Sequence, residues 1–269
     1  MINEYIGLTI RPVNSDSLPK YLELFKATYP NYKGSLEYLH WLYFQNPNGN
    51  VVGYDAYDKE LLVAHYVCIP IWIDSFEKPS LLSLNTATHP KYQGRGLLRV
   101  LGNNTFEASE DDFACVVGVA NANSIRPLTK HLGFKHIGDL ELRFGFFDFS
   151  RLGRRNFTEQ ESLWRSESPG KSLETKFCAG GFVRFTRRLY GIFPITAFCP
   201  VREQSLETAK TTRIFKKFGF TLDWRREQKP RIFLPKILKP SPLSFIFRGL
   251  SESDSTRLAT WTFPDFDAL

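Results

Sequence analysis

The sequence predicts an α/β (α+β) protein built on a mixed, mostly antiparallel sheet flanked by helices, with a C-terminal α+β extension. Three strand-like segments, 51–57, 61–73 and 81–88, follow one another with short polar connections, as in an antiparallel meander. A turn with two glycines then opens a helical segment at 97–108. A buried strand and a second helix follow, and this alternation makes the sheet mixed.

The first predicted element is a short strand at 8–12. Residues 16–28 follow as a helix because their apolar positions recur at helical spacing. A second helix around residues 36–44 ends at an Asn-Pro-Asn-Gly turn. This helix is crowded with aromatic residues, and Trp41 and Tyr43 are candidates either for core packing or for one wall of a substrate pocket.

The periods of apolar residues typical of helices and strands also predict the remaining elements of residues 1–150. After the meander and the helix at 97–108, we expect a strand at 113–119, a helix at 124–131 and one or two strands at 134–149.

The pattern weakens beyond Ser150. Residues 151–176 are polar and charged, and we interpret them as a linker or mobile excursion between a first domain at 1–150 and a C-terminal extension at 177–269. Gly-Phe follows a basic segment at both 130–134 and 216–220, so the extension is either a degenerate repeat or merely shares a helix cap. Within it we expect an apolar segment at 182–198, a helix at 206–218 and strands at 231–238, 243–247 and 259–263.

Composition bounds the class of protein. Apolar residues make up 42% of the 269 residues, which is enough for a packed core. The sequence has no run of about 18 apolar residues that could span a bilayer, and residues 1–5 lack the layout of an export signal. We therefore expect a cytoplasmic protein outside the membrane. The four cysteines form no CxxC pair and have no nearby His pattern, so we expect reduced thiols and no metal site.

Charge is distributed unevenly along the chain. Residues 1–149 contain 13 Lys and Arg against 16 Asp and Glu, a net charge of −3, whereas residues 150–269 contain 22 against 12, a net charge of +10. A positive half attracts anions such as a phosphate-bearing ligand, a nucleotide-linked sugar or nucleic acid. Nucleic acid is disfavoured because neither a stacking sheet nor a helix-turn-helix is recognisable. Solvated surface charge is the alternative.

The most informative segment runs from Asn85 to Phe134. Its glycine-containing turn leads into a helix, which presents free backbone N–H groups and the positive end of a helix dipole to a diphosphate. Glycine is also common wherever a chain needs a positive φ angle, so the turn alone fits a plain tight turn. The order of the surrounding parts is more specific: strand, glycine turn, helix, buried strand, Asn-led helix and Leu-Gly-Phe.

This order resembles the GNAT acetyltransferases, whose turn reads Gln or Arg, two residues, Gly, one residue, and then Gly or Ala. Gln93 and Gly96 match the pattern, and Leu98 takes the last position. Asn121-Ala122-Asn123-Ser124 is similar to the family's Asn-led helix. For residues 1–150 the resemblance implies a GNAT-type mixed sheet, two strands that splay apart, and acetyl-CoA as co-substrate without a metal.

The resemblance also implies roles for individual residues. A backbone N–H near Asn85 would polarise the thioester carbonyl, and Thr129 stands where many members carry the tyrosine that protonates the leaving thiolate. His65 and His89 are the candidate bases, although a lone strand histidine is commonly a packing residue, and a carboxylate such as Asp55, Glu60 or Glu107 acting through water is the alternative. The acceptor wall would include Trp41 and Tyr43. The expected cofactor-binding residues are Thr86, Ala87, Thr88, Gln93, Gly94, Arg95, Gly96, Leu97, Leu98, Asn123 and Arg126.

The sequence is therefore interpreted as an acetyl-CoA-dependent N-acetyltransferase that acts on the primary amine of a small molecule. It looks like GNAT proteins of bacterial surface-polysaccharide pathways in three segments, which implies a nucleotide-linked amino sugar as acceptor. Another amine, such as an aminoglycoside, a polyamine or a protein, is one alternative. A non-enzymatic module that senses acyl-CoA or binds nucleic acid is the other. The three segments are 41–47, 121–124 and 261–267.

Overall fold

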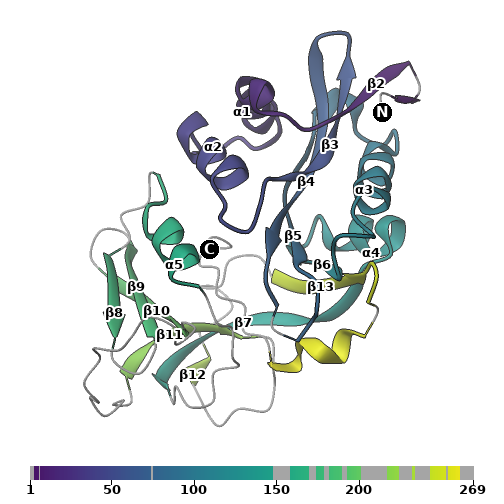
Figure 1. The fold of residues 1–269 in the computed structure, drawn as a ribbon. Helices are drawn as coiled ribbons and strands as arrows, with labels where there is room; N and C mark the ends of the chain where they lie inside the picture. Colours follow the sequence, from purple (N-terminus) through teal and green to yellow (C-terminus); the bar gives the residue numbers. More distant parts are fainter. Residues whose placement is uncertain are drawn as a thin grey trace.

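The computed structural model describes residues 3–5, 7–73, 75–147, 158–169, 174–178, 182–189, 193–200, 217–223, 232–233, 243–252 and 254–260 (Figure 1). In chain order its elements are β1 (Asn3–Tyr5), β2 (Leu8–Pro12), η1 (Ser15–Ser17), α1 (Leu18–Thr28), α2 (Leu36–Phe44), β3 (Val52–Asp58), β4 (Leu61–Ile71), β5 (Ser80–Thr88), η2 (Pro90–Tyr92), α3 (Leu97–Glu107), β6 (Cys115–Ala120), α4 (Ile125–Leu132), β7 (Lys135–Phe147), α5 (Glu159–Ser166), β8 (Glu174–Cys178), β9 (Phe182–Leu189), β10 (Phe193–Pro200), β11 (Lys217–Asp223), β12 (Ile232–Phe233), β13 (Leu243–Gly249) and η6 (Ser255–Thr260).

Within the described residues, a ten-stranded sheet forms the centre of the molecule. Its strand order is β1-β2-β3-β4-β5-β6-β13-β7-β11, and β12 also pairs with β7. The pair β5–β6 is parallel, and the other pairs in this sheet are antiparallel. The predicted fold class, a mixed and mostly antiparallel sheet flanked by helices, is confirmed. Each element predicted between residues 8 and 149 is also present, with small shifts at its ends.

In the described part of the chain, α1 and α2 cover one face of this sheet, and α3 and α4 cover the other (Figure 1). β4 explains why two cores form. Val67 and Ile69 point into the core beneath α1 and α2, whereas Tyr66 and Cys68 point into the core beneath α3 and α4. Because successive side chains of a strand face opposite sides, a strand buried on both faces reads as an unbroken apolar run.

The strand predicted at 243–247 lies in the main sheet, not beside it. β13 pairs with both β6 and β7, and Phe245, Ile246 and Phe247 are buried in the two cores. The chain therefore leaves the sheet after β7 and returns later to fill its middle (Figure 1). No local periodicity could reveal this, because the partners are far apart in the sequence. That a first domain ends near residue 150, and that the other C-terminal segments form a separate extension, stays a prediction.

A helix, α5, lies within the segment that was predicted to be a linker. It begins at Thr158, whose side chain accepts a hydrogen bond from Glu161 N while the Glu161 side chain accepts one from Thr158 N. This capping box is a recognised helix start in a sequence, and it went unused in the prediction. The helix is anchored on α2, because the rings of Trp164 and Trp41 stack 4.5 Å apart. Each indole N–H also donates to the other residue's backbone carbonyl, at 3.0 and 3.3 Å.

Other elements of the C-terminal half differ from the prediction. The described residues of the apolar segment 182–198 belong to β9 and β10, which join β8 in a separate sheet of three strands in the described part. Gly133 ends α4 with φ +66, whereas Gly219 lies inside β11 opposite Gly145, so the two Gly-Phe segments do not share a helix cap. Lys217 and Phe218 begin β11 rather than ending a helix, and 259–260 belong to η6 rather than to a strand. Residues 206–216, 231, 234–238 and 261–263, also assigned to predicted elements, lie outside the described residues.

No helix in the described residues is long and apolar enough to cross a membrane. Cys68 and Cys115 are buried and carry free thiols, as predicted. Burial raises the pKa of each thiol to about 12, so both stay protonated and unreactive near neutral pH.

The contact between α5 and α2 can be tested with Trp164→Ala. The substitution removes the ring stack and the N–H donor to the Trp41 carbonyl, so we expect the free energy of unfolding to fall by about 3 kcal/mol. Leu163, on the same helix but 46% exposed, is the control, and Leu163→Ala should cost about 0.5 kcal/mol or less. Chemical denaturation measures both, and equal losses would contradict the packing described here.

Candidate functional site

The parallel strands β5 and β6 pair over a short distance and then part. Their ladder runs from Leu81 opposite Val116 to Ser83 opposite Gly118. β5 continues to Thr88 and β6 to Ala120, and no further register pair joins them in the described residues. This parting agrees with the splay that the resemblance to GNAT enzymes implies.

The other edge of β5 is irregular at the same level. His65 of β4 pairs with Ala87, but Val67 pairs with Leu84, so that Asn85 and Thr86 face a single residue of β4. Such a bulge re-aims the backbone and side chains of the longer strand. Asn85 has φ +48, a left-handed conformation that asparagine tolerates better than most residues.

The predicted glycine turn is present and open. Gly94 and Gly96 both have φ +76, and Gly96 is the N-cap residue of α3 without any side-chain hydrogen bond to the cap. The turn residues from Gln93 to Gly96 are exposed, and a Cβ added at Gly94 would meet nothing within 4 Å. The backbone N–H groups at the start of α3 are therefore not covered by side chains of the turn.

The start of α4 is held by its own side chains. Asn121 Oδ1 accepts hydrogen bonds from Asn123 N and Ser124 N, both at 3.0 Å, and the side chains of Asn123 and Arg126 are exposed. The Thr129 hydroxyl donates to Ile125 O at 2.8 Å. It is therefore engaged with its own helix.

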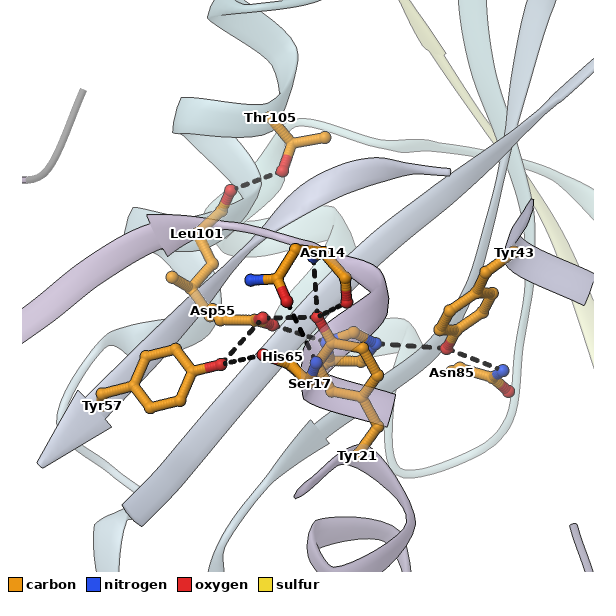
Figure 2. Close-up of polar contacts among 10 residues, drawn as sticks. All are labelled: Asn14, Ser17, Tyr21, Tyr43, Asp55, Tyr57, His65, Asn85, Leu101 and Thr105. Atoms are coloured by element: carbon orange, nitrogen blue, oxygen red, sulfur yellow. Dashed lines mark hydrogen bonds and ion pairs between the residues drawn. The ribbon is translucent and has the colours of Figure 1, made fainter. Parts of the chain in front are cut away.

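A buried chain of hydrogen bonds reaches the bulge of β5 from the α1–α2 side of the sheet (Figure 2). Asp55 Oδ1 lies 2.6 Å from His65 Nδ1, and His65 Nε2 lies 3.1 Å from the Tyr43 hydroxyl. Asn85 Nδ2 donates to that hydroxyl at 3.0 Å. The hydroxyl of Tyr21 donates to the second Asp55 oxygen at 2.8 Å. Five elements, α1, α2, β3, β4 and β5, thus contribute to one polar network.

Burial sets the protonation of the phenols around this network. It raises the pKa of Tyr43 well above its ordinary value, and the hydrogen bond from Asn85 offsets part of that rise. Burial first and the Asp55 carboxylate second raise the pKa of Tyr21, and the same two causes bring the pKa of Tyr57 to about 12. All three phenols therefore stay protonated and able to donate hydrogen bonds at neutral pH.

No protein-family model and no curated protein matches the sequence. Among solved structures, a probable N-acyltransferase of unknown function from Enterococcus faecalis V583 matches 91% of this chain and 73% of its own, with a TM-score of 0.58 and 8% identity. Arabidopsis thaliana NAA60 in complex with acetyl-CoA matches 50% of this chain and 88% of its own, with a TM-score of 0.41 and 19% identity. The ribosomal-protein-S18-alanine N-acetyltransferase from Escherichia coli matches 53% and 85%, with a TM-score of 0.39 and 17% identity.

The Enterococcus match covers 91% of this chain at a TM-score above 0.5, so it compares nearly the whole fold. The chain has a GNAT-type fold. At this level of identity the likeness establishes the fold and nothing about the reaction.

Within the GNAT-type fold, three of the predicted site residues come together and two do not. Tyr43, His65 and Asn85 share the buried network. Trp41 is instead covered by Trp164 of α5, which corresponds to the packing alternative for this residue. His89 caps η2, where its Nδ1 accepts a hydrogen bond from Lys91 N at 3.3 Å. The roles assigned to all five residues stay predictions.

Two tyrosines between α1 and α2 were not predicted as site residues. Tyr29 is 41% exposed, and its hydroxyl donates to the backbone carbonyl of Thr86 in the bulge. The Tyr32 hydroxyl is buried without a hydrogen-bond partner in the described residues, and burial raises its pKa to about 12. The available signal was an aromatic residue on each side of Pro30 and Asn31 in a helix connection, where binding residues are common.

The described residues contain no group of three or more His, Cys, Asp or Glu side chains that could hold a metal ion. The polar atoms of Asp55 and His65 are paired with each other and with tyrosines.

The Tyr57 phenol predicts how stability depends on alkaline pH. The pKa of this phenol is about 12 in the folded chain and about 10 in the unfolded chain. Its contribution to the free energy of unfolding is therefore complete below pH 10 and is lost as the pH rises toward 12. We expect the free energy of unfolding to fall across this window, and Tyr57→Phe to fall less steeply because Phe does not titrate. Denaturant titrations at a series of pH values measure both slopes, and identical slopes would contradict the assignment.

Proposed function

We propose that this chain is an acetyl-CoA-dependent N-acetyltransferase of the GNAT type that acetylates a primary amine. One observation carries the proposal: an open glycine turn at the start of α3 directly follows the strand that parts from β6. The turn suits a diphosphate, and the parted strands suit a long, narrow arm attached to it. The probable N-acyltransferase that shares the fold adds support at the level of analogy.

The diphosphate of acetyl-CoA would be held by backbone N–H groups between Gly94 and Leu98. These groups combine with the positive end of the α3 dipole, as in other anion sites at helix starts. Arg95 is exposed in the same turn and packs its guanidinium 4.7 Å from the centre of the Tyr92 ring, so it adds a positive charge. Asn123 and Arg126, at the exposed start of α4, are the proposed contacts of the pantetheine arm.

When bound, acetyl-CoA supplies an acetyl group activated as a thioester. The protein's part is to place that group and to stabilise the negative charge that develops on its carbonyl oxygen. After Ser83, β5 no longer pairs with β6, so N–H groups on that edge between Asn85 and Thr88 are available as donors. These are the backbone donors that we propose for the oxyanion.

The amine must lose a proton, and the leaving thiolate must gain one. We propose His89 as the base that contacts the acceptor amine directly, since it is half-buried at the end of β5. His65, in contrast, is 1% exposed, and both of its ring nitrogens are hydrogen-bonded. Thr129 does not replace the tyrosine acid of other members, because its hydroxyl is engaged with Ile125 O.

For the acceptor, we propose a small molecule with a primary amine, with a nucleotide-linked amino sugar first. The net charge of +10 in residues 150–269 suits the phosphates of such a sugar. Tyr29 and Tyr32 replace Trp41 as the proposed acceptor wall. The exposed Tyr29 contacts the bulge and Tyr32 is half-buried in the same helix connection, whereas Trp41 is buried beneath Trp164. Tyrosine rings combine an apolar face with a polar tip, which suits a sugar ring.

A thiol-release assay with a panel of amines tests the function. The panel contains nucleotide-linked amino sugars, aminoglycosides, polyamines and peptides, each with acetyl-CoA. Turnover with a nucleotide-linked amino sugar supports the full proposal, and turnover only with another amine removes the proposed acceptor. Tight binding of acetyl-CoA without turnover of any amine would favour an acyl-CoA sensor instead.

The glycine turn gives a sharper prediction about the cofactor. Gly94→Val places a branched side chain in the open space where the diphosphate would lie, so we expect acetyl-CoA affinity to fall about tenfold or more, a loss above 1.4 kcal/mol. Gly7→Val is the matched control, since Gly7 has a similar φ of +71 and also has open space around it. Calorimetry on both variants decides the matter, and equal affinities would remove the proposed cradle.

A further inference from the structure

Consecutive hydrogen bonds join Asp55, His65, Tyr43 and Asn85, so these four residues can act together. We propose that Asp55, His65 and Tyr43 form a buried hydrogen-bonded chain that positions Asn85 and, through it, the bulged segment of β5. The proposal rests on the proposed function, because this segment carries the suggested oxyanion donors. The three residues are positioning residues, and none of them contacts the substrate.

Burial excludes a direct catalytic role for three of the four members. Asp55 and Tyr43 are 0% exposed and His65 is 1% exposed, whereas Asn85 is half-buried. The ring of His65 also packs 4.3 Å from that of Tyr21 and 5.5 Å from that of Phe25, inside the core. Whatever the buried residues do at the site must therefore pass through Asn85.

The hydrogen bonds of the chain run in one consistent direction. The carboxylate of Asp55 accepts from His65 Nδ1, so in the neutral ring Nε2 is an acceptor and accepts a hydrogen bond from the Tyr43 hydroxyl. The Tyr43 oxygen is then left as the acceptor for Asn85 Nδ2. Each donor in the series meets an acceptor. Satisfied buried networks of this kind hold their members in one arrangement.

Asn85 is the residue at which such a tether acts on the backbone of β5. It has a positive φ, it lies in the bulge opposite Tyr66, and its strand has already left the β6 ladder. A positive φ in a residue other than glycine persists when the surroundings impose it. The Tyr43 hydroxyl imposes it from the side chain, and the Tyr29 hydroxyl holds the next carbonyl, that of Thr86.

The experiment compares two substitutions that each remove one buried hydroxyl. Tyr43→Phe removes the hydroxyl that links His65 to Asn85 through hydrogen bonds. Thr105→Val is the matched control, since Thr105 is also 0% exposed and its hydroxyl donates to the Leu101 carbonyl at 2.8 Å, but it lies in α3 on the opposite face of the sheet (Figure 1). Amide hydrogen exchange of residues 84–88 is measured for both, and kcat is measured per acetyl-CoA site titrated by calorimetry.

Tyr43→Phe should speed exchange in residues 84–88 about tenfold, as expected for the loss of one buried hydrogen bond, and should lower kcat by a similar factor. The KM for acetyl-CoA should change little, and Thr105→Val should leave the exchange rates at 84–88 and kcat near those of the unsubstituted chain. The same exchange rates in both variants would overturn the proposal. The exchange measurement needs no turnover, so it tests the proposal even if no amine is acetylated and the proposed function fails.

Asn85→Gly provides a second test that keeps the fold, since glycine adopts a positive φ without strain. It removes the amide that Tyr43 holds. If the buried hydrogen bonds act through Asn85, adding Tyr43→Phe to Asn85→Gly should lower kcat no further, because both substitutions break the link between Tyr43 and Asn85. Additive losses in the double variant would show that Tyr43 acts by another route and would overturn the proposal.

Discussion

The site depends on the point where β5 and β6 stop pairing, at Ser83 and Gly118. A parallel ladder uses the N–H and C=O groups of both strands, so an unbroken one would leave no donors for a ligand. Once the ladder ends, β5 is free to bulge against β4 and to present the backbone of 85–88 on its open edge. The short helix η2, the glycine turn and α3 come next along the chain, so the amides proposed to bind the diphosphate follow the end of β5 closely.

The return of β13 into the centre of the sheet holds this arrangement together. β13 pairs on both sides, and its Arg248 reaches the backbone carbonyl of Leu132 at the end of α4 and packs over the Phe106 ring of α3. The segment between β7 and β13 is also joined to the first half through Trp164 and Trp41. Trp41 and Tyr43 lie on the same helix, so α5 steadies the element that carries Tyr43.

The candidate site could be predicted from sequence where its features are local. Gly94 and Gly96 were recognised as a turn before a helix because only a short segment is needed to see it, and their positive φ angles agree. His65, Tyr43 and Asn85 were selected individually, but Asp55 could not be ranked, because the contact that distinguishes it joins β3 to β4. Trp41 was left between core packing and the acceptor wall, because the sequence of a helix does not show which neighbour covers an aromatic residue.

The sequence by itself determined the elements between residues 8 and 149, the mixed sheet they form and the glycine turn, since periodicity and turn chemistry act over a few residues. Only the tertiary structure decided that β13 fills the middle of the sheet, that α5 packs on α2, and that a buried chain of side chains ends at Asn85. These three features depend on contacts between distant segments. Such contacts form because apolar area and polar groups must find partners when they leave water, and local patterns do not say which partners these are.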